Sequence, residues 1–295
     1  MLFAVPTLVP DQLVPYDGGQ LRRYAGDGPP VLLVHGLGVN HLNFDFQPRV
    51  SLADALREEG WDVWVVELPG DDGEAVDADA DAWAHVHLDA AMDVVLGATG
   101  ADGLFAVGHS LGAMMLLAHL DDPRLRAAVA VSGAGQFEHT TRWVRMGRRL
   151  RSPGSGGSAA AVRSLAWTLP LNPALDVLGV RRNLDRRLTA GLVRHALVDS
   201  PPAVVRQVHG WTRGGDLTRT DGAPWVAWEG GTPTLFVTGA RDRLVSVDDV
   251  RATCARLPSC DLEVLPGYGH VDPLLGVRSR DEVTPRILRW LAERS

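Results

Sequence analysis

Ser110 lies in the pentapeptide Gly-His-Ser-Leu-Gly of residues 108–112, a pattern that can present a hydroxyl group as a nucleophile. An apolar run over residues 104–107 precedes the pentapeptide, and a helical run over residues 113–118 follows it. The pattern G-x-S-x-G between a strand and a helix is typical of a sharp turn with a strained serine. Glycines at both ends are expected because side chains there would collide with the neighbouring strand and helix. The alternative is a tight turn in which Ser110 only caps the helix.

A serine hydroxyl is a poor nucleophile until a base takes its proton and a third group orients that base. Asp242 follows the apolar run of residues 234–238, and His270 lies in a glycine-rich loop after residues 262–265. Both positions are just beyond the carboxyl end of a predicted strand, where ligand sites gather in open α/β sheets. We therefore predict Ser110 as nucleophile, His270 as base and Asp242 as the orienting acid.

Other interpretations of these two residues remain open. His270 could be a loop histidine bonded only to backbone, and Asp242 could be an exposed turn residue or a helix cap. Asp248 and Asp249 compete for the acid role, although they lie at the start of the next helix or inside it. Asp272, two residues after His270, could assist the histidine loop, but an exposed turn position is favoured.

A predicted strand at residues 31–34 opens into the turn His35-Gly36-Leu37-Gly38. Acyl transfer places negative charge on a carbonyl oxygen, which two preorganised backbone N–H groups can stabilise. The N–H groups of Leu37 and Leu111 are the expected donors, the second because it lies at a helix N-terminus. The alternative is a plain turn that ends the strand.

The His-Gly turn, the pentapeptide around Ser110, Asp242 and His270 occur in the order found in the α/β-hydrolase superfamily, which the chain resembles. Residues 43–46, 61–68 and 269–272 are similar to lipase and esterase members, including those like acid lipases. Many relatives carry a Gly-His-Gly-x-Ser turn after the fourth strand, whereas residues 69–74 here read Pro-Gly-Asp-Asp-Gly-Glu. This departure concerns substrate details rather than the chemistry.

Short apolar runs alternate with helical patterns and predict a doubly wound, mainly parallel sheet with an inserted helical cap. Strands are expected near residues 21–25, 31–35, 62–67, 103–108, 126–132, 233–238 and 261–265, with residues 13–16 pairing with 21–24 in an antiparallel start. Helices are expected near residues 50–59, 80–97, 111–120, 247–257 and 281–293. Residues 1–133 and 229–295 form the predicted α/β-hydrolase core.

Residues 134–228 form the predicted cap, with helical patterns near 138–151, 160–168, 173–179, 185–197 and 201–213. A Gly/Ser-rich stretch at residues 153–158 could permit movement of this lid or could be an inert surface loop. Some apolar residues of the cap must form its own core, and others could line an apolar pocket above Ser110. The candidate substrate contacts are His35, Gly36, His109, Trp143, Trp167 and Trp211.

Composition limits the classes of function. The 295 residues include 45% hydrophobic residues, and the formal net charge of −7 gives no footprint for nucleic acid or an anionic membrane. No lysine occurs, which excludes Schiff-base chemistry and a P-loop lysine. The acidic residues of 71–81 favour a solvated loop and a helix N-terminus over a calcium site. We expect no cofactor and no bound metal.

Cys254 and Cys260 are the only cysteines, and two free thiols in a reduced cytosol are favoured over a disulfide. Residues 1–10 show no secretory signal, and no apolar run approaches the ~20 residues of a membrane-spanning helix. The expected location is therefore cytoplasmic, and the sequence does not indicate the oligomeric state.

The residue pattern favours hydrolysis of carboxylic esters with an apolar acyl group through an acyl-serine intermediate. The same residues could serve an acyltransferase, a thioesterase or a cofactor-free perhydrolase. A ligand-binding receptor or scaffold with this fold is the alternative from a different class, because fold does not fix function.

Overall fold

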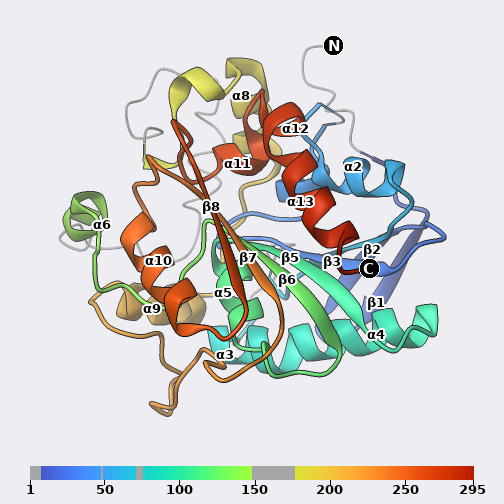
Figure 1. Cartoon of the computed structure of the whole chain (residues 1–295), viewed down its shortest axis with the longest axis horizontal. Helices are drawn as coiled ribbons and strands as arrows, with labels where there is room; N and C mark the ends of the chain where they lie inside the picture. Colours follow the sequence, from blue (N-terminus) through green and yellow to red (C-terminus); the bar gives the residue numbers. More distant parts are fainter. Residues whose placement is uncertain (1–7, 48, 71–75, 148–176) are drawn as a thin grey trace.

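The computed structural model describes residues 8–47, 49–70, 76–147 and 177–295. An eight-stranded sheet runs through the described part of the chain, in the order β1-β2-β4-β3-β5-β6-β7-β8. Helices lie on both of its faces, as Figure 1 shows. The strands are β1 (Gln12–Tyr16), β2 (Gly19–Tyr24), β3 (Pro30–Val34), β4 (Asp62–Glu67), β5 (Leu104–His109), β6 (Leu125–Val131), β7 (Thr234–Gly239) and β8 (Cys260–Leu265).

The sheet is parallel from β4 to β8 and antiparallel at its N-terminal edge. β1 and β2 form the predicted hairpin, with Val14 opposite Leu21, and β2 pairs antiparallel with β4. β3 pairs with both β4 and β5, so the strands that precede the His35 turn and Ser110 are neighbours. The doubly wound α/β prediction is confirmed.

The helical segments fall close to the predicted positions in the core. They are α1 (Leu42–Asp45), α2 (Leu52–Glu58), α3 (Ala80–Ala82), the π-helix η1 (Trp83–Leu88), α4 (Asp89–Thr99), α5 (Leu111–Leu117), α6 (Arg142–Gly147), the 3₁₀ helix η4 (Arg181–Asn183), α8 (Arg186–His195), α9 (Pro202–Trp211), α10 (Val247–Arg256), α11 (Asp272–Leu275), α12 (Ser279–Glu282) and α13 (Thr284–Ala292). The short helices α1 and α11 were not predicted, because four residues are too few to show an apolar periodicity.

Caps explain where several helices begin. The Ser51 side chain accepts from Asp54 N–H before α2, and Asp79 accepts from Ala82 N–H before α3. These contacts satisfy N–H groups that have no partner within the helix. Asp79 is one of the acidic residues of 71–81, which confirms a helix N-terminus in that run; residues 71–75 lie outside the described part.

Two apolar clusters hold the helices against the sheet. Side chains from α4, α5 and α10 pack on one face, around Trp64 and Phe236. Side chains from α2 and α13 pack on the other face, around Phe105 and Leu235. In Figure 1 these helices lie on opposite sides of the strands. Burial on both faces explains why the parallel strands are continuously apolar.

The described part of residues 134–228 contains helices and lies between β6 and β7 in the chain. Some of its side chains pack into the main core. Val204, Trp211 and Trp225 belong to the same apolar cluster as α4 and α5. The Ala80 N–H donates to the Gln207 side chain, which ties α9 to the start of α3. The second half of this insertion is therefore part of the main core. The helices predicted at 160–168 and 173–179, and the stretch 153–158, lie wholly or mostly outside the described residues.

The prediction of two free thiols is wrong, because Cys254 and Cys260 form a disulfide with a Cα–Cα distance of 5.5 Å. α10 ends at Arg256 and β8 begins at Cys260, so the chain reverses within a few residues. This reversal brings the two cysteines together. The disulfide contradicts the reduced thiols that were expected together with a cytoplasmic location. Within the described residues, no helix is both long enough and apolar enough to span a membrane.

Candidate active site

Ser110 occupies a strained turn between β5 and α5. Its φ of 53° and ψ of −115° are unusual for a residue with a side chain. A Cβ atom on Gly108 would lie 2.5 Å from backbone atoms of Gly112, and one on Gly112 would overlap the carbonyl groups of Val34 and His35. The Ser110 side chain makes no capping hydrogen bond to α5 and is partly exposed. Its hydroxyl is therefore available, and the interpretation as a simple helix cap is wrong.

The side chains of Ser110, His270 and Asp242 form one hydrogen-bonded chain. His270 Nε2 lies 2.9 Å from Ser110 Oγ, and His270 Nδ1 lies 2.8 Å from Asp242 Oδ2. An ionised carboxylate can only accept, so Nδ1 carries the imidazole proton and Nε2 accepts from the serine hydroxyl. The imidazole is 4% exposed and the carboxylate 0%. The structure thus brings together three residues that are far apart along the chain.

Asp242 is fixed in a turn after β7. Its second oxygen, Oδ1, accepts from the N–H groups of Leu244 at 2.8 Å and Val245 at 3.0 Å. These hydrogen bonds orient the carboxylate toward His270 and supply the donors that a buried charge needs. Of the competing residues, Asp248 is exposed, whereas Asp249 is buried against Ser246 and His139.

The turn after β3 lies directly against Ser110. A Cβ atom on Gly36 would lie 3.1 Å from Ser110 Cβ, a tight contact that glycine avoids. The Gly36 N–H donates to Asn43 Oδ1 at 3.2 Å, and the Gly38 N–H donates to Ser200 Oγ at 2.9 Å. Within the described residues, no protein group accepts from the N–H of Leu37, which lies between these two.

His35 and His109 are buried behind this turn. His35 Nδ1 bonds to the Gly36 carbonyl at 2.9 Å, and His109 Nδ1 donates to Asn43 Oδ1 at 2.8 Å. Burial lowers the pKa of His109 to about 3, and the nearby His270 acts in the same direction. His109 is therefore a neutral, buried imidazole whose single N–H supports the turn through Asn43. Asn43 was not among the predicted site residues, although it belongs to the lipase-like segment 43–46.

Two further residues hold the loop of His270. The Ser132 hydroxyl donates to the His270 carbonyl at 2.7 Å. Asp272 is 0% exposed, which contradicts the expected exposed turn position. It accepts from the Gly269 N–H at 2.9 Å, and its burial raises its pKa. A lone polar residue in a loop gives no sequence signal of burial, so its position could not be derived.

The candidate tryptophans have different surroundings. Trp211 is 5% exposed and packs edge-on against Trp225, with ring centroids 4.7 Å apart. This places Trp211 in the core rather than in an open pocket. Trp143 is partly exposed and lies under Arg243, 4.7 Å from the ring centroid, so it borders the loop of Asp242. Trp167 lies outside the described residues.

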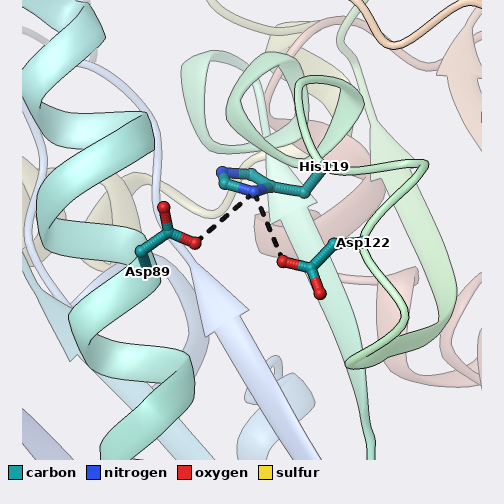
Figure 2. Close-up of side chains that lie close together, drawn as sticks. All are labelled: Asp89, His119 and Asp122. Carbon is teal, nitrogen blue, oxygen red and sulfur yellow. Dashed lines mark ion pairs between the residues drawn. The ribbon is translucent and has the colours of Figure 1, made fainter.

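A second polar cluster, of Asp89, His119 and Asp122, lies between α4 and the end of α5 (Figure 2). His119 Nε2 donates to the Ala84 carbonyl at 3.0 Å, and Nδ1 lies 3.8 Å from Asp89 and 4.0 Å from Asp122. Arg124 already bridges the same two carboxylate oxygens, at 2.5 and 2.6 Å. The Arg124 guanidinium therefore supplies a positive charge to both carboxylates.

The fold and the hydrogen-bonded side chains of Ser110, His270 and Asp242 define the class of protein. A family model described as the alpha/beta hydrolase family matches residues 31–284. The chain belongs to this family.

Two curated proteins and one solved structure are similar to the chain over most of its length. The chain is 29% identical over 274 residues to a pimeloyl-[acyl-carrier protein] methyl ester esterase of Xanthomonas campestris, covering 90% of this chain and 96% of the relative. It is 26% identical over 313 residues to triacylglycerol lipase 1 of Arabidopsis thaliana, covering 89% and 79% respectively. The solved structure of a thermophilic esterase from Thermogutta terrifontis superposes with a TM-score of 0.65 at 21% identity, covering 96% of this chain and 100% of that chain. This last similarity concerns the fold.

Proposed function

We propose that this protein is a serine hydrolase that cleaves carboxylic esters with an apolar acyl group. The observation that carries the proposal is the hydrogen-bonded chain from Asp242 through His270 to Ser110. The two curated relatives support the reaction class, since one is named for a methyl ester and the other for triacylglycerol. An apolar acyl group is supported by the second relative, which is named for triacylglycerol.

In the proposed reaction, His270 takes the proton of Ser110 as the hydroxyl attacks the ester carbonyl. Asp242 stabilises the imidazolium that forms, and the N–H groups of Leu37 and Leu111 stabilise the negative oxygen. His270 then protonates the leaving alcohol, which leaves an acyl-serine. Water activated by the same imidazole releases the acid and restores Ser110.

The turn after β3 supports the role of Leu37. Hydrogen bonds to Asn43 and Ser200 fix the N–H groups on both sides of it. Among the described residues no group accepts from the Leu37 N–H, as a preorganised donor requires. The second donor is the N–H of Leu111. Leu111 is the first residue of α5, where the N–H groups and the helix dipole both favour a negative charge.

The test is reaction with a fluorophosphonate probe together with turnover of nitrophenyl esters of increasing acyl length. The wild-type protein should be labelled at Ser110, and Ser110→Ala should lose label and at least about a thousand-fold in kcat. Ser259→Ala, which removes a hydroxyl remote from the site, is the matched control and should keep wild-type rates.

Thioesters, and alcohols in competition with water, should be included as substrates. A protein that prefers either would be a thioesterase or an acyltransferase with the same residues. Unlabelled wild-type protein, or ester turnover that survives Ser110→Ala, would refute the proposed function.

A further inference from the structure

Asp272, at the start of α11, is a buried carboxylate surrounded by hydrogen-bond donors. Its Oδ2 accepts from the Gly269 N–H at 2.9 Å and from the Asn183 side-chain amide at 2.8 Å. The Val180 N–H is 3.1 Å from Oδ1 and 3.0 Å from Oδ2. A buried carboxylate is tolerated when donors of this kind satisfy it, and the resulting charge-assisted hydrogen bonds are strong.

These donors come from two segments that are distant in sequence. Gly269 directly precedes His270 in the loop after β8. Val180 and Asn183 belong to the insertion between β6 and β7, at and just before η4. One carboxylate therefore joins the loop of the proposed base to the insertion.

Further hydrogen bonds join the same two segments. The Val271 N–H donates to the Leu178 carbonyl at 2.9 Å, and the Val277 N–H donates to the Asn183 carbonyl at 2.8 Å. The Asn183 side chain also donates to the Gly267 carbonyl at 2.9 Å. The contact thus begins before His270 and continues through α11.

The two segments pack backbone against backbone. A Cβ atom on Gly269 would lie 3.0 Å from the Cα of Gly179, and one on Gly179 would overlap Asp272. No side chain separates the segments there, so a displacement of one must move the other.

We propose that Asp272, held by Asn183, is a positioning residue that fixes the main chain of His270 against the insertion. Asp242 orients the imidazole ring, whereas Asp272 sets where the backbone of that residue lies. This inference rests on the proposed function, in which His270 is the base and must be held in place. The position matters because a displacement of about 1 Å in a reacting group can cost about 100-fold in rate.

The experiment measures the rate of phosphonylation of Ser110 in Asp272→Ala, Asp272→Asn and Asn183→Ala. Proton NMR of the downfield N–H between His270 and Asp242 is recorded on the same samples. Asp272→Ala and Asn183→Ala should react about 10- to 100-fold more slowly and show a shifted or broadened N–H signal. Asp272→Asn keeps an acceptor oxygen and should stay within about threefold of wild type.

Asp185→Ala is the matched control. Asp185 caps α8 in the same insertion but contacts Arg187 and Leu188 rather than the loop of His270. Its loss should lower the urea midpoint of unfolding and leave the labelling rate unchanged.

Wild-type rates and an unchanged N–H signal in folded Asp272→Ala and Asn183→Ala would overturn the proposal. Equal slowing in Asp185→Ala would also overturn it, because the effect would then follow general loosening of the insertion. If Asp272→Ala does not fold, the labelling rate and the N–H signal of Asn183→Ala test the proposal. If the wild type is not labelled at all, the proposed function fails, but the NMR signal needs no substrate and still tests the positioning.

Discussion

His109 and His270 are neighbours, with ring centroids 5.2 Å apart, but their surroundings suit them to different tasks. The ring of His270 lies between a carboxylate and a hydroxyl, so a positive charge on it would be stabilised. His109 faces Asn43 and the His270 carbonyl, and none of the carboxylates in the described part of the chain is bonded to it. A neutral His109 is useful in the proposed mechanism, because a second positive charge so close would oppose protonation of the base.

The low pKa of His109 predicts a pH-dependent loss of stability. The folded protein holds this imidazole neutral down to a pKa of about 3, whereas the unfolded chain protonates it near pH 6.5. Between these values the unfolded state binds more protons, so stability falls as the pH drops below 6.5. From pH 7 to pH 5 the contribution of His109 amounts to about 2 kcal/mol.

Urea denaturation at both pH values checks this prediction. The stability of His109→Gln should fall by about 2 kcal/mol less than that of the wild type between pH 7 and pH 5. His195→Gln, which replaces an exposed histidine at the end of α8, should follow the wild type. An identical fall in all three proteins would show that His109 is not held neutral.

At the scale of elements, the site depends on how closely α5 approaches β3. The helix begins at Leu111. Its second residue, Gly112, packs directly against the backbone carbonyl groups of Val34 and His35. This contact fixes the distance between the elbow and the turn after β3. The same packing thus positions Ser110 and the N–H of Leu37 relative to each other.

Gly112→Ala should therefore be strongly destabilising, although alanine is the better helix former. Its methyl group would overlap two carbonyl groups, so α5 would have to move off the sheet, at a cost of at least about 2 kcal/mol. Gly97 in α4 is the matched control, because a Cβ atom there meets nothing within 4 Å. Gly97→Ala should stabilise the protein by about 0.5–1 kcal/mol.

Thermal and urea unfolding of the two glycine variants distinguish packing from helix propensity. Opposite signs are expected for the two changes in unfolding free energy. If Gly112→Ala were neutral or stabilising, α5 would not be in close contact with β3, and the account of how the elbow is placed would be wrong.

At the scale of the molecule, the sequence predicted the parallel core because each strand is a short apolar run with a helix pattern after it. It also predicted the hydrogen-bonded chain of Ser110, His270 and Asp242, since all three follow such strands. Asn43 was not predicted as a site residue, and Asp272 was expected to be exposed, because their partners, His109 and Asn183, are 66 and 89 residues away. Single polar residues carry no periodicity from which such contacts could be derived.

The insertion at 134–228 was predicted as a separate cap, but its described second half shares the core of the sheet. Trp225 donates to the Met114 carbonyl at 2.7 Å, and Trp211 packs against Trp225. Apolar periodicity identifies the buried face of a helix without identifying what covers it. The sequence therefore left open whether these tryptophans face a pocket or a core of the cap's own, and it did not indicate the main core.

The shared core predicts unequal effects for two tryptophans of the insertion. Trp211→Ala removes a buried ring and should cost about 3–5 kcal/mol of unfolding free energy while the protein still unfolds in one transition. Trp143→Ala removes a partly exposed ring stacked with Arg142 and Arg243 and should cost less than about 1 kcal/mol. Urea denaturation followed by circular dichroism measures both. A small loss for Trp211→Ala, or a second transition in the wild type, would mean that the insertion folds apart from the sheet.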